Sequence, residues 1–276
     1  MKKKLHFGLL GESLPHTLSP EIHEYLFARQ KIDASYEKIE LPKDEVRQIF
    51  NYMKSKDLLG INVTIPHKEL VCEMVDVPDE HAKKIGAVNT ILIKDGVSYG
   101  YNTDYIGVLS MFHKANVSLA NKKIVILGSG GSAKALVYAF YLAGAQTIIV
   151  AARNITACAQ LKQQFPYLET CSLNDILQGD IIINTTPMGM YPNTEKSPVD
   201  ISVIQNFSIA CDIVYNPLMT TFLQLAKEAN LQVVTGLMML VDQAIAAQEI
   251  WFDKSLDYTL GNDIHDKLAR QLRYEP

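Results

Sequence analysis

The stretch NKKIVILGSGGSAKALVYAFYLAGAQTIIVAAR (residues 121–153) carries the pattern that decides the fold. Two short apolar runs flank a segment with helical composition, which predicts a strand, a helix and a second strand. Gly128, Gly130 and Ala133 form a GxGxxA motif between the first strand and the helix. The glycines permit a tight turn and the close approach of a pyrophosphate to the helix N-terminus, and the alanine permits close helix packing. The stretch predicts a dinucleotide-binding βαβ unit; a tight turn without a ligand is the alternative.

The end of the second strand indicates which dinucleotide is bound. An Asp or Glu at this point binds the ribose 2′-hydroxyl of NAD, whereas an arginine can bind the 2′-phosphate of NADP. The chain has Arg153 here, in VAARN (150–154), and no carboxylate. The sequence therefore predicts NADP as the cofactor, and a solvated arginine at a strand end is the alternative.

Strand and helix patterns alternate over the whole chain, which predicts an α/β fold built from parallel βαβ units. DIIIN (180–184) and IACDIV (209–214) contain continuous apolar runs, as strands buried on both faces of a parallel sheet do. Strands are also expected at 5–10, 35–41 and 60–65, and helices at 19–30, 43–55, 104–115 and 238–252. The helix 238–252 could return to pack on the N-terminal part.

Local signals refine these elements. Ser19 is expected as an N-cap with Pro20 just inside the helix, and Pro66 as the first residue of another helix. Asp95-Gly96 predicts the turn of a hairpin within residues 87–102.

Lys68, in INVTIPHK (61–68), then falls in the first helical turn. A cation at the positive end of the helix dipole is disfavoured by roughly 0.3–1 kcal/mol. A structural role gains nothing from that position, so the placement indicates another role for this lysine.

Composition narrows the class of protein. The 276 residues suggest about two domains, and the net charge of −4 gives no sign of a nucleic-acid or membrane-surface partner. The four cysteines form no CxxC pair, the histidines form no HExxH pattern, and no run is long enough for a membrane helix. The basic N-terminus lacks the apolar run of a signal peptide. We expect a cytoplasmic protein without a metal.

Eight blocks, in order, resemble the shikimate dehydrogenases over nearly the whole chain. They are GESLPHTLSPEIH (11–23), NVTIPHK (62–68), GAVNT (86–90), YNTDYIG (101–107), GSGGSAKA (128–135), NTTPMGM (184–190), DIVYNP (212–217) and GLMMLVDQA (236–244). The resemblance implies reversible, NADPH-dependent reduction of 3-dehydroshikimate to shikimate, in the chorismate route to aromatic amino acids. It also implies a discontinuous substrate domain (1–103 and 238–276) and a Rossmann-type NADP domain (104–237), with the active site in a cleft between them.

The resemblance further implies the site residues. Catalysis falls to Lys68 as proton donor and Asp104 as its partner. The substrate residues are Thr17, Ser19, Asn62, Thr64, Asn89, Tyr215 and Gln243. The cofactor residues are Gly128, Ser129, Gly130, Gly131, Ser132, Ala133, Ala152, Arg153, Thr186, Met188, Ile213, Gly236 and Met239. For the apolar members of the cofactor set, a position in the core without contact to the cofactor is an equally good interpretation. Ser19 of the substrate set is also expected to cap a helix.

Two positions depart from the family pattern. Thr17 stands where serine is common, and its extra methyl can alter substrate preference by roughly 1–3 kcal/mol if it crowds the pocket. Ala157 stands where a second cation usually helps to bind the cofactor phosphate. A quinate/shikimate dehydrogenase with relaxed NAD or NADP use is therefore the alternative, and a non-catalytic metabolite sensor is a more remote one. Both monomers and homodimers occur in the family.

Overall fold

The computed structural model describes residues 4–176 and 178–274, which divide into two compact units. Unit 1 comprises residues 4–104 and Leu240–Ile264, and unit 2 comprises Tyr105–Met239 and residues 265–274. Each unit contains one six-stranded sheet.

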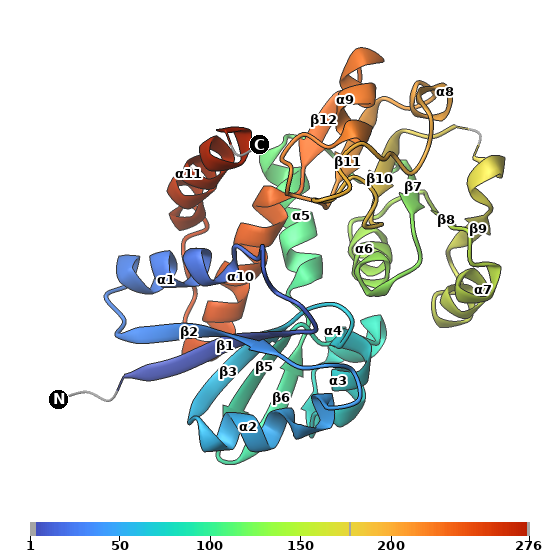
Figure 1. The fold of residues 1–276 in the computed structure, drawn as a ribbon. Helices are drawn as coiled ribbons and strands as arrows, with labels where there is room; N and C mark the ends of the chain where they lie inside the picture. Colours follow the sequence, from blue (N-terminus) through green and yellow to red (C-terminus); the bar gives the residue numbers. More distant parts are fainter. Residues whose placement is uncertain (1–3, 177, 275–276) are drawn as a thin grey trace. The chain divides into compact units, whose positions relative to one another are not determined.

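The sheet of unit 1 has the strand order β2-β1-β3-β5-β6-β4 (Figure 1). Its strands are β1 (Leu5–Gly11), β2 (Ala34–Glu40), β3 (Leu58–Val63), β4 (Val77–Pro78), β5 (Thr90–Lys94) and β6 (Val97–Tyr101). β1 pairs in parallel with β2 and with β3, whereas β5 is antiparallel to both β3 and β6. The expected hairpin is confirmed: Asp95 and Gly96, with φ of 51° and 77°, form the two-residue turn between β5 and β6.

Two helices of unit 1 begin later than the sequence suggested. Among residues 4–103, the helices are α1 (Ser19–Arg29), the 3₁₀ helix η1 (Val46–Gln48), α2 (Ile49–Ser55), α3 (Lys68–Met74) and α4 (Glu80–Ile85). The helix expected from Pro66 begins at Lys68, because a turn closed by His67 N–H donating to Thr64 O (3.0 Å) comes first. The helix expected from residue 43 begins only at Val46, after a similar turn. Ser19 is not the N-cap of α1: Leu18 is, and Ser19 is the first helical residue.

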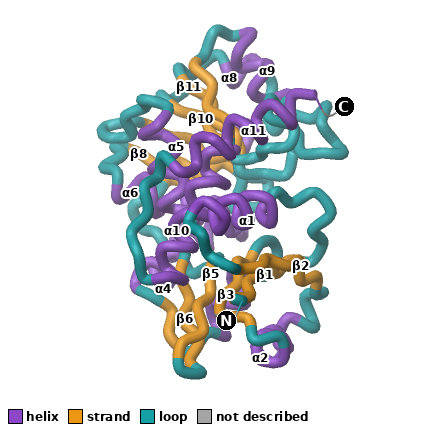
Figure 2. The backbone as a smooth tube through the Cα atoms, turned by 90° about the vertical axis from the view of Figure 1, so that its left-hand side faces the viewer, coloured by secondary structure: helices purple, strands orange, loops and turns teal. Residues whose placement is uncertain are grey.

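Side chains alternate between the two faces of this sheet and build a core on each. Phe7 and Leu9 of β1 pack with Phe27 of α1 and with Trp251 of α10 (Leu237–Phe252). Leu10 points to the opposite face and packs with residues of α2, α3 and α4. Figures 1 and 2 show α1 and α2 on opposite sides of the strands. The helix near the C-terminus thus packs on the N-terminal strands, as its apolar pattern suggested.

Unit 2 contains an all-parallel sheet with the order β12-β11-β10-β7-β8-β9. Its strands are β7 (Lys123–Leu127), β8 (Thr147–Ala151), β9 (Glu169–Cys171), β10 (Ile181–Asn184), β11 (Ile209–Asp212) and β12 (Gln232–Thr235). This is the doubly wound order of dinucleotide-binding folds, and the strand order reverses between β7 and β10. Ligands of such sheets bind at the carboxyl ends of the strands on either side of that point.

Helices cover both faces of the second sheet. The helices of unit 2 are α5 (Asp104–Lys114), α6 (Gly131–Leu142), α7 (Ile155–Gln164), η2 (Leu173–Asp175), α8 (Ile201–Ile204) and α9 (Thr221–Glu228), and α11 (Leu260–Tyr274) has residues in both units. Val125 and Leu127 of β7 pack with Phe222 and Leu223 of α9 on one face. α9 begins at a true cap, because the Thr220 hydroxyl accepts from Leu223 N–H.

Two observations concern the described part of the chain as a whole. It contains no helix that is both long and apolar enough to span a bilayer. It also contains no group of three or more His, Cys, Asp or Glu side chains placed to bind a metal ion.

Candidate active site

An ion pair between Lys68 and Asp104 lies at the centre of the polar residues of unit 1. Lys68 Nζ is 2.7 Å from Asp104 Oδ2, and the two side chains are only 12% and 7% exposed. Lys68 follows the turn after β3, and Asp104 follows β6, so the two reach each other from the ends of different strands. Two charges removed from water this far are stabilised only if their remaining polar atoms are also bonded. The Asn89 amide meets that requirement for Asp104.

Asn89 fixes the orientation of the Asp104 carboxylate. Its Nδ2 donates to Asp104 Oδ1 at 2.8 Å, so one carboxylate oxygen binds the lysine and the other binds the amide. The same amide contacts Thr103 Oγ1 (3.0 Å) and Gln243 Oε1 (3.4 Å), and its own oxygen accepts from Thr103 N–H (2.7 Å). Lys68, Asp104, Asn89 and Gln243 therefore form one hydrogen-bonded group.

Asn62 extends this group toward the centre of the sheet. Its Nδ2 donates to Thr90 Oγ1 (3.0 Å) and to Asn89 O (3.3 Å), and its oxygen accepts from the Tyr36 hydroxyl (2.8 Å). Each polar atom of the amide thus has a partner, which prevents Asn62 from rotating.

A buried histidine, His23, packs against the ring of Tyr36. The His23 ring stacks on the Tyr36 ring with centroids 4.3 Å apart and planes 7° apart. Gln248 Nε2 lies 3.1 Å from His23 Nδ1 and donates to the His23 carbonyl at 3.2 Å. Burial lowers the pKa of His23 to about 3 from its usual 6.5, with an opposing contribution from Asn62. The ring is therefore neutral in the folded protein over the physiological pH range.

Three hydroxyls stand at the same edge of the unit 1 sheet, after β1 and β3. Thr17 Oγ1 accepts from Ser19 N–H (3.3 Å) and donates to Ser19 Oγ (3.2 Å), which places these two side chains together. Thr64 follows β3 and its N–H donates to Leu10 O of β1 (2.8 Å). Lys38 Nζ donates to Leu14 O (2.8 Å) and so holds the loop that leads to Thr17. Tyr215, the remaining expected substrate residue, belongs to unit 2 and follows β11.

The turn between β7 and α6 has the shape that a dinucleotide needs. Gly128 has φ of 110°, and a side chain there would also lie 2.8 Å from Thr185 Oγ1. Gly130 has ordinary extended backbone angles, yet a Cβ there would meet no atom within 4 Å. The open space above Gly130, at the N-terminus of α6, is where a pyrophosphate can approach the backbone. Ser129, Gly131 and Ser132 complete the turn, and Ala133 is fully buried beneath it.

An arginine, Arg153, stands just after the end of β8. Ala152 is buried and Arg153 is exposed. Asn154 caps α7, because its side chain accepts from Ala157 N–H at 3.0 Å. The residues at this strand end fit NADP, since no carboxylate stands where the ribose 2′-hydroxyl of NAD would bind.

The other expected cofactor residues lie on the loops after β10, β11 and β12 or at the start of α10. They are Thr186, Met188, Ile213, Gly236 and Met239. Gly236 must lack a side chain, because a Cβ would lie 2.6 Å from the Ile213 carbonyl. Met239 is 8% exposed, as a core residue would be.

Several residues with clear roles in these networks were absent from the sequence expectations. Thr103, Tyr36 and His23 belong to the network of unit 1, and Asn184 and Asp212 bond to each other in unit 2. Most of them stand inside the sequence blocks that carried the family resemblance, which was the available signal.

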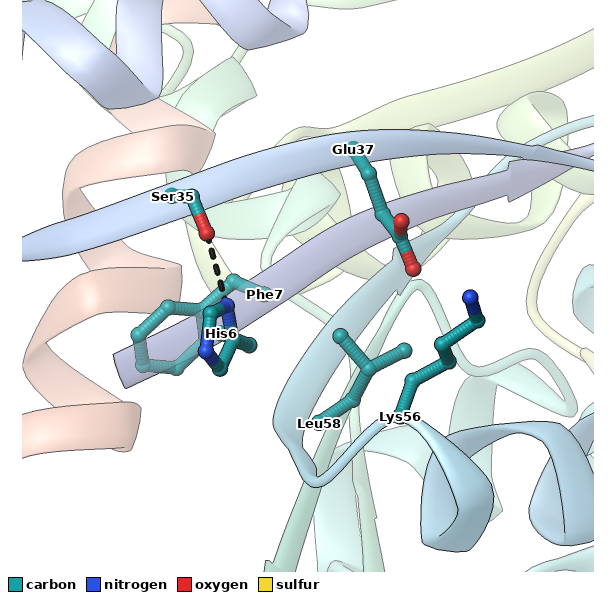
Figure 3. Close-up of a pocket in the computed structure, with 6 residues that line it drawn as sticks. All are labelled: His6, Phe7, Ser35, Glu37, Lys56 and Leu58. Carbon is teal, nitrogen blue, oxygen red and sulfur yellow. Dashed lines mark hydrogen bonds between the residues drawn. The ribbon is translucent and has the colours of Figure 1, made fainter. Parts of the chain in front are cut away.

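A small pocket lies elsewhere on unit 1 (Figure 3). It encloses about 170 Å³ and is lined by His6, Phe7, Ser35, Glu37, Lys56 and Leu58. His6 Nδ1 lies 2.8 Å from Ser35 Oγ. Its strand residues stand near the amino ends of β1, β2 and β3, opposite the edge that carries Asn62. It contains none of the expected site residues.

Comparisons with known proteins agree with this geometry. Residues 9–91 match the family model for the shikimate dehydrogenase substrate binding domain, and residues 111–204 match that for shikimate / quinate 5-dehydrogenase. A curated shikimate dehydrogenase (NADP(+)) from Clostridium perfringens is 42% identical over 95% of this chain and 97% of its own.

Two crystal structures extend the comparison. Shikimate dehydrogenase 1 from Peptoclostridium difficile is 39% identical, with a TM-score of 0.91 over 97% of this chain and 99% of its own. Shikimate 5-dehydrogenase from Thermus thermophilus, solved in complex with NADP(H) and shikimate, is 29% identical, with a TM-score of 0.87 over 95% of this chain and 99% of its own. By sequence over nearly its full length and by structure, the chain belongs to the shikimate dehydrogenase family.

Proposed function

We propose that the chain catalyses the reversible, NADPH-dependent reduction of 3-dehydroshikimate to shikimate, a step toward chorismate and the aromatic amino acids. The observation that carries this proposal is the Lys68–Asp104 ion pair of 2.7 Å, held by Asn89, in a chain of this family. Relatives of 40% and 42% identity bear the name shikimate dehydrogenase (NADP(+)).

Lys68 is the proton donor. When bound, NADPH supplies the hydride that adds to the carbonyl carbon, which leaves negative charge on the carbonyl oxygen. Lys68 Nζ gives that oxygen a proton and takes it back in the reverse direction. Asp104 holds the ammonium group in place and can also accept a hydrogen bond from a substrate hydroxyl.

The remaining polar residues bind the ring and its carboxylate. Thr17 and Ser19 offer paired hydroxyls to the carboxylate, with Tyr215 of unit 2 assigned to the same group. The ring hydroxyls are assigned to Asn62, Thr64, Asn89 and Gln243. Because Asn62 and Asn89 are buried and held by their own hydrogen bonds, they present polar atoms in fixed positions to those hydroxyls.

Unit 2 binds NADP. The turn from Gly128 to Ala133 receives the pyrophosphate, and Ala152 and Arg153 receive the adenosine 2′-phosphate. The nicotinamide half is assigned to Thr186, Met188, Ile213, Gly236 and Met239. In this proposal residues 1–103 and 238–276 form the substrate domain and residues 104–237 the NADP domain.

The setting of the enzyme follows from its chemistry. We place it in the cytoplasm, where thiols persist, because its four cysteines form no CxxC pair and no disulfide joins them in the structure. Its partners are the substrate and NADP, without nucleic acid or membrane, and it works as a monomer or a homodimer.

A broader quinate/shikimate dehydrogenase is the second candidate, and two residues favour it. Thr17 adds a methyl beside the site of the substrate carboxylate, and the absence of a cation at Ala157 leaves Arg153 as the sole cation of VAARNITA (150–157) for the phosphate. Steady-state assays of nicotinamide absorbance with shikimate or quinate, each with NADP or NAD, separate the two. Preference for shikimate with NADP supports the first function, and comparable rates with quinate or NAD support the second. No turnover in any combination, with NADPH binding retained, would indicate a sensor instead.

A further inference from the structure

Asp212 is a fully buried carboxylate whose bonding partners are all neutral. It stands at the last position of β11, directly opposite Asn184, the last residue of β10, in the parallel register. Asn184 Nδ2 donates to both of its oxygens, at 3.0 and 3.1 Å. The Thr220 hydroxyl donates at 2.7 Å and Val214 N–H at 2.9 Å. Burial raises the pKa of Asp212 to about 7, although the hydrogen bonds act to lower it. Burying an ionised carboxyl group at this position is therefore unfavourable for the free energy of folding.

The pair holds two loops by their backbones. Asp212 Oδ1 accepts from Val214 N–H and so fixes the start of the loop after β11. Asn184 Oδ1 accepts from Thr186 N–H (2.9 Å) and from the Thr186 hydroxyl (2.7 Å), and Asn184 Nδ2 donates to Met188 O (3.1 Å). One carboxylate and one amide thus define the relative position of both loops.

These loops stand at the carboxyl ends of the strands on one side of the switch point, where a doubly wound sheet binds its ligand. They carry three of the five residues assigned above to the nicotinamide half, Thr186, Met188 and Ile213. Neither Asp212 nor Asn184 needs to touch the cofactor, because their polar atoms are occupied by the loops themselves.

We propose, on the basis of the function proposed above, that Asp212 and Asn184 are positioning residues that set the spacing of the two loops around the nicotinamide ring. An apolar pair would fill the same volume without the cost of burying a carboxyl group. What such a pair lacks is the set of directional acceptors for Val214 N–H and Thr186 N–H.

The first test uses the protein without cofactor, so it does not depend on the proposed activity. Asp212→Asn sets two amides against each other and removes one acceptor oxygen. Amide hydrogen exchange should then accelerate at least tenfold in peptides covering residues 184–190 and 212–217 and stay unchanged over β7. The matched control is Asp180→Asn, because Asp180 accepts from Lys123 N–H (2.8 Å) at the amino end of the same strand, β10. Equal exchange in the parent and Asp212→Asn at both peptides would overturn the proposal.

The second test separates the two halves of the cofactor. Nicotinamide fluorescence should report a Kd for NADPH raised at least tenfold in Asp212→Asn, while adenosine 2′,5′-bisphosphate, which lacks the nicotinamide half, keeps its parental Kd. The exchanged pair Asn184→Asp/Asp212→Asn restores donor against acceptor and should recover part of the affinity. Equal weakening of both ligands, or parental NADPH affinity, would refute the positioning role. If the parent chain itself binds no NADPH, the proposed function fails, while the exchange result still stands.

Discussion

Replacing His23 with glutamine is expected to remove the contribution of this imidazole to the acid sensitivity of unit 1. The His23 pKa is about 3 in the folded protein, and 6.5 is its ordinary value. Below pH 6.5 the imidazole therefore takes up a proton in the unfolded chain but not in the folded one. Proton uptake by the unfolded state lowers the free energy of unfolding as the pH falls from 6.5 toward 3.

The size of the effect follows from the two pKa values. Each pH unit in this window corresponds to about 1.4 kcal/mol, so the loss at pH 4.5 is about 3 kcal/mol and grows further toward pH 3. A glutamine at 23 does not titrate. The difference in unfolding free energy between parent and His23→Gln should therefore shift by about 3 kcal/mol between pH 7.5 and pH 4.5 in favour of the variant.

Urea unfolding followed by tryptophan fluorescence measures this difference in unfolding free energy for unit 1, which contains both His23 and Trp251. Trp251 is the only tryptophan of the chain, and its ring lies 5.2 Å from that of His23. Tyr36→Phe is the matched control, because it removes the hydroxyl bonded to Asn62 and leaves His23 in place, so its difference from the parent should not change with pH. A parent–His23→Gln difference that stays constant from pH 7.5 to 4.5 would refute the assignment of a buried neutral imidazole.

Three further expectations concern the proposed activity. Lys68→Ala should lower kcat about 10²–10⁴-fold with little change in the KM for shikimate, because it removes the proton donor; turnover close to that of the parent would contradict this role. Arg153→Ala should raise the KM for NADP about tenfold or more and leave that for NAD unchanged, because a hydrogen bond to a charged group is worth about 1.5–3 kcal/mol; an equal rise for both cofactors would remove the 2′-phosphate assignment. Gly130→Val should keep the parental Tm in scanning calorimetry, because its side chain enters open space, yet raise the Kd for NADPH about tenfold or more; unchanged affinity would show that the pyrophosphate lies elsewhere.

The sequence predicted the elements of unit 2 well because their burial leaves a strong signal. β7, β8, β10 and β11 lie inside an all-parallel sheet covered on both faces, so each contains a continuous run of at least three apolar residues. Element starts were predicted less well. Proline is common at the first helical position, but in residues 64–67 it belongs to a turn, and α3 starts after that turn closes.

In the site, too, some residues were predicted from the sequence and others were not. The family blocks pointed to Lys68, Asp104 and Asn89, and the structure joins these three directly. Asp212 received no role, because an aspartate at a strand end resembles an ordinary exposed residue until the neighbouring strand is in register. Its partner Asn184 lies 28 positions earlier in the chain, and only the pairing of β10 with β11 brings the two together.

The packing of Trp251 against the first strands has a consequence for how the protein is made. Its indole fills the space above Gly60, where a Cβ would lie 2.4 Å from Nε1, and it donates to Ile91 O at 3.0 Å. The ribosome completes β1 and β3 long before it reaches α10. At about 5–20 residues per second, the interval between Gly60 and Trp251 is roughly 10–40 s. During that interval the face of the nascent sheet that carries Phe7 lacks the indole, so unit 1 is completed only after most of unit 2, residues 105–239, has been synthesised.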